Sequence, residues 1–133
     1  MQERFLKSEN LTLVRTTEGK LPCLPFAVLK REILGKKYKL SIYFIGRNKS
    51  LELNKKLRGK NRPANVLSFP YSKSSGEIML CLSEARKGAK KFGKKYPEFV
   101  GFLVIHGMLH LKGIKHSSRM EAKEKFLAEK LLG

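Results

Sequence analysis

The segment from Pro97 to Leu111, PEFVGFLVIHGMLHL, constrains the fold more than any other part of the chain. It is apolar nearly all round, and a helix without a polar face belongs at the centre of a domain. Pro97 fits the first turn of such a helix, and Gly113 fits the position just after its end. His106 and His110 interrupt this apolar surface, where burial without a partner costs roughly 2 kcal/mol or more for each ring. The two imidazoles therefore need a partner.

The three histidines of the chain, His106, His110 and His116, all fall within the window HGMLHLKGIKH. Residues four apart on a helix lie within about 40° of each other and ~6 Å apart along the axis, so two such rings can bind one cation. Gly113 allows the backbone to leave the helix and His116 to return as a third ligand. Three neutral imidazoles with an open fourth position are typical of catalytic zinc, although imidazoles also suit Ni, Cu and Co. The competing interpretation is three unrelated histidines.

The spacing H-x3-H-x2-G-x2-H matches the ligand-and-turn pattern of long zincins. Zincin proteases place a glutamate directly after the first histidine, where it acts as general base. Here that position is Gly107, so peptide hydrolysis is disfavoured. The sequence predicts zincin-like ligand geometry with a chemistry other than proteolysis.

The rest of the chain alternates strand-type and helix-type patterns before becoming helical from Ser83 onward. We expect an α+β fold: a single zincin-like domain over residues 1–133, with a small mixed β-sheet of about four strands and a central metal-bearing helix. The expected strands cover residues 11–15, 39–45, 66–71 and 76–82, and the expected helices cover residues 22–34, 48–58, 83–95, 97–112 and 118–132.

The chain carries 29 Lys and Arg against 11 Asp and Glu, a formal net charge of +18 over 133 residues. The positive electrostatic field of this charge favours a polyanionic partner such as RNA. The alternative is that the charge only reflects a Lys-rich proteome. No apolar stretch approaches the ~20 residues of a membrane span and no signal peptide is evident, so we expect a cytoplasmic protein without a membrane partner. The predicted RNA-docking residues, otherwise a solvated helix face, are Arg86, Lys87, Lys90, Lys91 and Lys94.

Two motifs of the sequence resemble those of one family. HGMLHLKGIKH is similar to the HGxLHLxGYDH signature of the YbeY-type bacterial endoribonucleases, which are implicated in ribosomal RNA maturation. LNKKLRGKNRPANVLSFP, residues 53–70, resembles that family's LN…R followed by T(D/N)VLSFP, and Gly76-Glu77-Ile78 is similar to its GDI. The resemblance covers roughly residues 40–120 and holds both motifs in the same order.

The resemblance implies that His106, His110 and His116 bind one zinc ion and that Arg58 faces it as a catalytic residue. It further implies a hydrolase, a single-strand-specific endoribonuclease acting in small-subunit rRNA 3′-end maturation and ribosome biogenesis. A metal-activated water would attack the phosphodiester. The implied partners are ribosomal RNA or the small ribosomal subunit, together with ribosome-associated proteins.

The chain departs from the family motif at several positions. Ile114 and Lys115 replace Tyr and Asp, Ala64 replaces Thr, and Glu77 replaces Asp. The missing Asp removes a possible hydrogen-bond acceptor for a ligating imidazole. Glu77 is the motif carboxylate left for acid–base chemistry, its alternative being a strand residue on a solvent face, so no general acid is assigned.

Two other functions stay open at this stage. One is a non-catalytic RNA-binding factor for ribosome assembly in which the metal is structural. The other is a metallohydrolase acting on a different phosphoester or an amide, which leaves the positive charge unexplained.

Overall fold

The computed structural model describes residues 3–8, 10–114 and 118–132. In chain order its elements are β1 (Glu3–Ser8), β2 (Leu11–Arg15), α1 (Phe26–Ile33), β3 (Lys39–Ile45), α2 (Arg47–Arg58), β4 (Val66–Ser72), β5 (Ser75–Cys81), α3 (Leu82–Lys91), α4 (Tyr96–Leu111) and α5 (Ser118–Leu132). From β2 onward, this order confirms the predicted α+β arrangement. The sequence does not predict β1, because ERFLKS is rich in charge and lacks apolar alternation, a composition that an edge strand tolerates.

The strands form a mixed sheet in the order β1-β2-β3-β5-β4, so the described chain has five strands where about four were expected. The three inner strands β2, β3 and β5 are parallel, and the edge strands β1 and β4 are each antiparallel to their neighbour. Pro70 fits β4 because an edge strand has one side without ladder hydrogen bonds. The edge position also leaves β4 open on the side away from β5.

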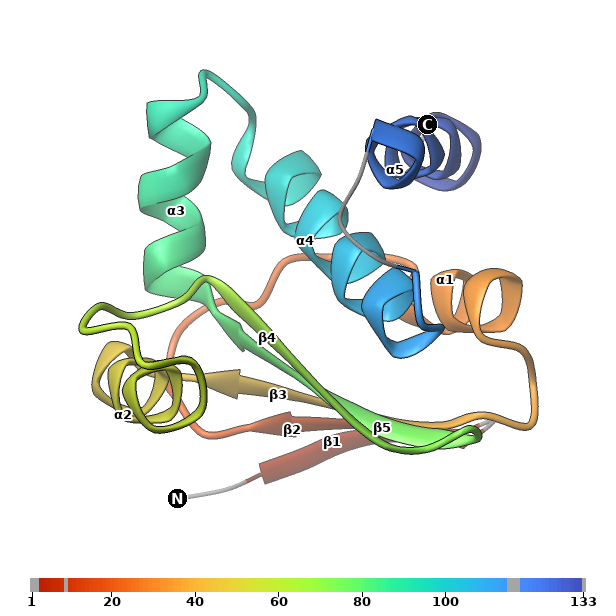
Figure 1. The fold of residues 1–133 in the computed structure, drawn as a ribbon, viewed down its shortest axis with the longest axis horizontal. Coiled ribbons are helices and arrows are strands. Elements are labelled where there is room, and N and C mark those ends of the chain that lie inside the picture. The colour runs from red at the N-terminus through yellow and green to blue at the C-terminus, as the bar shows by residue number, and fades with distance from the viewer. Residues whose placement is uncertain (1–2, 9, 115–117, 133) are drawn as a thin grey trace.

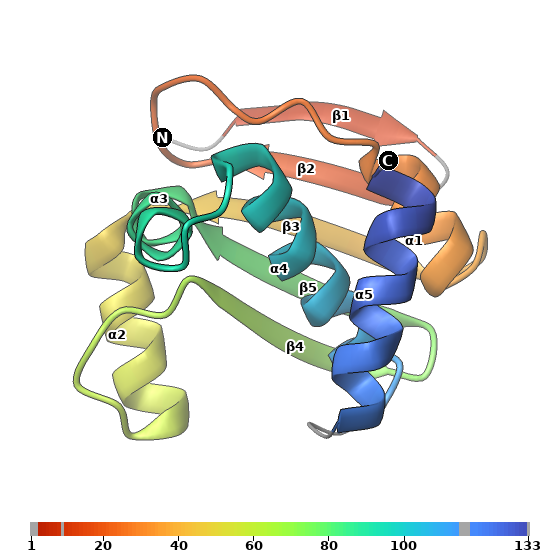
Figure 2. The ribbon, with the colours of Figure 1, turned by 90° about the horizontal axis from the view of Figure 1, so that it is seen from above.

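One face of the sheet carries the core. Leu40, Ile42 and Phe44 of β3 and Ile78 and Leu80 of β5 are at most 1% exposed. Figures 1 and 2 show α4 running across this face, with α1 and α5 on the same side of the sheet. The same views place α2 at one end of the sheet, outside that helical layer.

Helix α4 is the predicted central helix, with Pro97 in its first turn and ten of its 16 residues buried. It lies directly on the sheet at Gly107, where an added Cβ would come within 3.1 Å of both Ile78 Cδ1 and Ser68 Oγ. The Ser68 hydroxyl donates a hydrogen bond of 3.1 Å to the Gly107 carbonyl. Gly113 has a φ of +91°, as expected for a glycine that ends a helix. Position 107 therefore faces the sheet, where a glutamate side chain has no room.

Across the residues that the structure describes, no helix is both long enough and apolar enough to cross a bilayer.

Candidate metal centre

Two of the three predicted metal ligands lie together on α4. The Nε2 atoms of His106 and His110 are 3.1 Å apart, and the ring centroids are separated by 4.6 Å. Two nitrogens bound to a tetrahedral zinc ion at about 2.0–2.1 Å are separated by roughly 3.3 Å, so the observed spacing is close to one edge of such a site. The pair can therefore share one ion with little movement of either ring.

The third predicted ligand, His116, lies outside the described residues, as does Lys115. Within the described part of the chain, no group of three His, Cys, Asp or Glu residues is arranged to hold a metal ion. The three-histidine site therefore stays a prediction that rests on His106 and His110.

A carboxylate from another helix contacts the far side of the first imidazole. Oε1 of Glu124, on α5, pairs with Nδ1 of His106, and the two side chains are only 16% and 22% exposed. No motif or spacing in the sequence predicts this role of Glu124. It lies 18 residues after His106, among several other glutamates of a charged helix, and no spacing rule distinguishes it from them.

The two histidines open into a cavity of about 540 Å³ that also contains Arg58. Arg58 is the last residue of α2, and Gly59, with φ +65°, ends that helix in the left-handed region. The remaining lining comes from the end of α2, the loop before β4 and β4 itself, and consists of Leu57, Asn65, Val66, Leu67, Ser68, Phe69 and Pro70. The structure thus brings Arg58 together with two of the predicted ligands, although these residues are about 50 positions apart in sequence.

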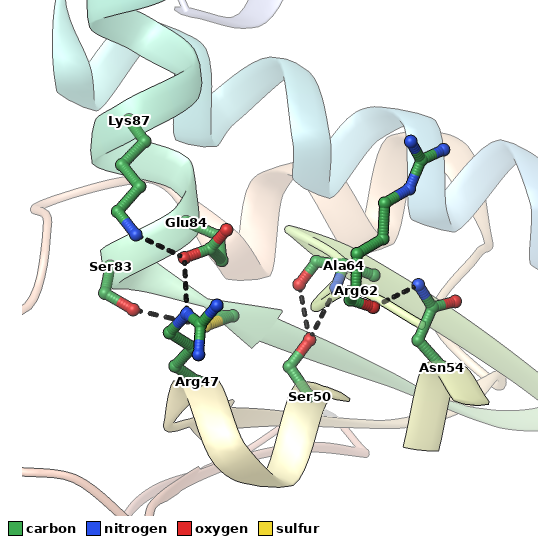
Figure 3. A network of polar contacts seen from close by, with 9 residues as sticks. Arg47, Ser50, Asn54, Arg62, Ala64, Ser83, Glu84 and Lys87 are labelled. Atoms are coloured by element: carbon green, nitrogen blue, oxygen red, sulfur yellow. Dashed lines mark hydrogen bonds and ion pairs between the residues drawn. The ribbon is translucent and has the colours of Figure 1, made fainter. Parts of the chain in front are cut away.

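The loop that lines this cavity is tied to α2 by two buried side chains, shown in Figure 3. The hydroxyl of Ser50 donates to the Ala64 carbonyl at 2.5 Å and accepts from the Ala64 N–H at 2.8 Å. Asn54 Nδ2 donates to the Arg62 carbonyl at 2.8 Å. The Asn of the LN motif therefore holds a loop in place, a role that the motif alone does not predict.

The predicted RNA-docking residues divide into two groups. All five are exposed, but Arg86, Lys87, Lys90 and Lys91 line neither of the two cavities that His106 lines. Lys94 does, because it lines a cavity of about 270 Å³ together with His106 and Glu124. Its ammonium lies 4.8 Å from the centre of the ring of Phe102, which lines the same cavity.

Glu77 is placed away from the histidines. Its neighbours on β5, Gly76 and Ile78, face the helical layer, so Glu77 points to the opposite face of the sheet. There it accepts a hydrogen bond of 2.6 Å from the Tyr71 hydroxyl, which raises the pKa of Tyr71 to about 12. This position agrees with the solvent-face interpretation of Glu77.

The protein thus has a mixed β-sheet covered by a helix that carries two histidines, and these histidines line a cavity together with an arginine. A family model described as Endoribonuclease YbeY matches residues 20–132. The chain therefore belongs to the YbeY family of endoribonucleases.

Individual relatives agree with this assignment. The Endoribonuclease YbeY of Chromohalobacter salexigens is 33% identical over 129 residues, covering 92% of this chain and 84% of that protein. The Endoribonuclease YbeY of Staphylococcus carnosus is 29% identical over 115 residues, covering 77% of this chain and 75% of its own length. The solution structure of TM1509 from Thermotoga maritima superposes with a TM-score of 0.58 at 28% identity, covering 80% of this chain and 78% of TM1509.

Proposed function

We propose that this protein is a zinc-dependent endoribonuclease that cleaves single-stranded RNA during maturation of the 3′ end of small-subunit ribosomal RNA. The observation that carries this proposal is the convergence of His106 Nε2 and His110 Nε2 in the cavity that holds Arg58. Membership of the YbeY endoribonuclease family supports the reaction class. The small ribosomal subunit, and proteins associated with it, are the partners implied by that role.

The donor set fits a borderline-soft divalent ion. Two neutral imidazole nitrogens, with His116 as the proposed third, match the ligand chemistry of catalytic zinc and leave a coordination position free. When bound, zinc supplies Lewis acidity, which lowers the pKa of a coordinated water toward ~7 and polarises phosphoryl oxygens. Position 107 is a glycine, so the chain lacks the glutamate that serves as general base in zincin proteases, which argues against peptide hydrolysis.

Arg58 supplies the charge that a phosphodiester requires. Its guanidinium is always cationic and presents a planar fork of N–H donors that matches two non-bridging phosphate oxygens. Because Arg58 shares a cavity with both histidines, we assign it to hold the scissile phosphate and to share the negative charge that builds up there. We assign Lys94, which lines the adjoining cavity, to contact a neighbouring phosphate.

The test is cleavage of a single-stranded RNA by the purified protein, with and without a chelator, compared with the same sequence as a duplex. We expect chelation and His110→Ala each to abolish cleavage, with zinc restoring only the wild type. Arg58→Ala should lower the cleavage rate by about a hundredfold, the usual cost of losing one charge-stabilising donor. Lys37→Ala is the matched control, since Lys37 is exposed and lines neither of these cavities.

Two results would contradict the proposal. Cleavage that survives His110→Ala would exclude the metal mechanism. RNA binding without any cleavage by the zinc-loaded wild type would instead favour a non-catalytic RNA-binding factor with a structural metal.

A further inference from the structure

The carboxylate of Glu124 contacts the first predicted ligand, His106, on the side of the ring away from His110. Nδ1 of His106 pairs with Glu124 Oε1, while Nε2 of the same ring lies 3.1 Å from His110 Nε2. An ionised carboxylate can only accept a hydrogen bond, so Nδ1 must carry the proton. In the neutral ring, Nε2 is then the unprotonated nitrogen, and it is the nitrogen that faces His110. The contact thus selects the tautomer that can bind a metal through Nε2.

Packing of α5 fixes where Glu124 points. Met120 and Ala128 lie one helical turn before and after it, on the same face of the helix, and they are 0% and 7% exposed. Farther along α5, Leu132 packs so tightly on Gly101 of α4 that an added Cβ there would lie 2.5 Å from Leu132 Cδ1. These apolar contacts set the rotation of α5 and direct Glu124 at α4.

A departure from the family motif makes this contact more important for the first ligand. The motif that the chain resembles has an acid immediately before its last histidine, whereas this chain has Lys115. An acceptor provided by α5 does not depend on that residue. Glu124 also lines the 270 Å³ cavity beside His106, and its side chain is only 16% exposed.

We propose that Glu124 is a positioning residue for the metal centre: by accepting the Nδ1–H of His106, it fixes the ring with Nε2 toward the ion. This inference rests on the proposed metal site, but its structural part can be tested without metal. Partners of this kind typically change metal affinity by 10- to 100-fold when they are removed.

The experiment compares wild type, Glu124→Ala, Glu124→Gln and the control Glu121→Ala, which removes an exposed glutamate from the same helix. In the metal-free proteins, ring-nitrogen NMR reports which nitrogen of His106 carries the proton. We expect the Nδ1–H form in the wild type, in Glu121→Ala and in Glu124→Gln, whose amide oxygen still accepts. The Nε2–H form should become populated in Glu124→Ala.

Binding of Co²⁺, followed by its visible absorption in competition with a chelator, gives the second measurement. We expect Glu124→Ala to lose about 10- to 100-fold in affinity and Glu124→Gln to lose several-fold, because a neutral amide is a weaker acceptor than a carboxylate. If Glu124→Ala does not fold, as judged by thermal unfolding, the affinity of Glu124→Gln decides the matter.

The outcomes separate the two proposals. An unchanged His106 tautomer in Glu124→Ala, or affinities of both Glu124 variants equal to that of Glu121→Ala, would overturn the positioning role. A wild-type protein that binds no Co²⁺ would refute the metal centre itself, whereas a tautomer shift in the same sample would still establish the contact between Glu124 and His106.

Discussion

At the scale of single residues, several polar side chains bind a specific partner elsewhere in the chain. Glu124 orients His106 by contact, and Asn54 holds a loop by one hydrogen bond. Tyr71 and Glu77 form a comparable pair on the opposite face of the sheet. Each pair joins residues that a sequence pattern does not connect.

The Tyr71–Glu77 pair gives a prediction about pH. The hydrogen bond to Glu77, followed by burial and the charge of Glu77, raises the Tyr71 pKa from 10.0 to about 12. A raised pKa means that the contact stabilises the folded protein fully below pH 10 and is lost as the pH rises toward 12. Glu77→Gln should move the Tyr71 pKa back toward 10, as measured by tyrosinate absorbance, with Tyr71→Phe identifying the signal. An unchanged Tyr71 titration in Glu77→Gln would contradict the assignment.

A second prediction concerns Gly107, where α4 touches the sheet. In Gly107→Ala the new methyl group would lie 3.1 Å from Ile78 Cδ1, an atom of a fully buried side chain. Overpacking of this kind costs about 1–3 kcal/mol, and the better helix propensity of Ala returns about 1 kcal/mol. We therefore expect a net loss of about 1 kcal/mol in the free energy of unfolding, measured by denaturant titration.

The same substitution in an Ile78→Val background serves as its control. Val lacks the Cδ1 methyl group, so Gly107→Ala should cost less there than in the wild type. Equal costs in the two backgrounds would show that the contact with Ile78 is not the cause.

At the scale of elements, the candidate site is assembled from α2, the loop before β4, β4, α4 and α5. Helix α2 lies at one end of the sheet and lines the site with its last two residues, Leu57 and Arg58, and with the loop that follows. Ser50 and Asn54 hold this loop in place, as Figure 3 shows. The anchoring of the loop therefore decides how well Arg58 and Asn65 are placed.

Loss of the Asn54 anchor should loosen this loop. Asn54→Ala removes the side-chain donor of the Arg62 carbonyl, and the loss of one such hydrogen bond costs about 1 kcal/mol. We expect faster amide hydrogen exchange over residues 59–65 and faster trypsin cleavage after Lys60. Asn61→Ala, an exposed position in the same loop, should leave both rates unchanged. Equal loop protection in the two variants would remove Asn54 from this role.

The elements differ in how far the sequence predicts them. The all-round apolar pattern of residues 97–111 requires a central helix, and the spacing of His106 and His110 requires that the rings be neighbours; the structure confirms both. The sequence does not predict β1, because its charged sequence lacks a strand pattern. Its strand conformation comes with its pairing to β2. Glu124 and Asn54 escape prediction because tertiary packing, which local periodicity does not contain, gives each its partner. Arg58 was identified only through the motif that surrounds it.

At the scale of the whole molecule, the net charge of +18 provides an electrostatic background for the site. The five predicted docking residues on and after α3 are exposed, and Lys94 connects them to the cavity of His106. Charge at this distance raises affinity for any RNA strand and does not select a sequence. Selection of a cleavage position must therefore come from the shape of the substrate or from a partner.

This background is measurable as a salt dependence. For single-stranded nucleic acid, each neutralised phosphate contributes about 0.7 to the slope of log affinity against log salt concentration. Replacing Arg86, Lys87, Lys90, Lys91 and Lys94 together with Gln should reduce the slope by up to about 3.5, measured by fluorescence anisotropy with a single-stranded RNA. Lys94→Gln alone should reduce it by about 0.7, and Lys37→Gln should leave it unchanged. A slope insensitive to the five substitutions would place the RNA on another surface.

The pairing of His106 with Glu124 also sets an order of events during synthesis. The carboxylate is encoded 18 residues after the histidine that it contacts. At about 5–20 residues per second, a ribosome needs roughly one to four seconds to add that stretch. The strands of the sheet are made before this interval and α4 is completed within it, so α4 is made before the carboxylate that pairs with His106. A nascent chain that stops after α4 therefore carries His106 and His110 without the residue that orients the first of them.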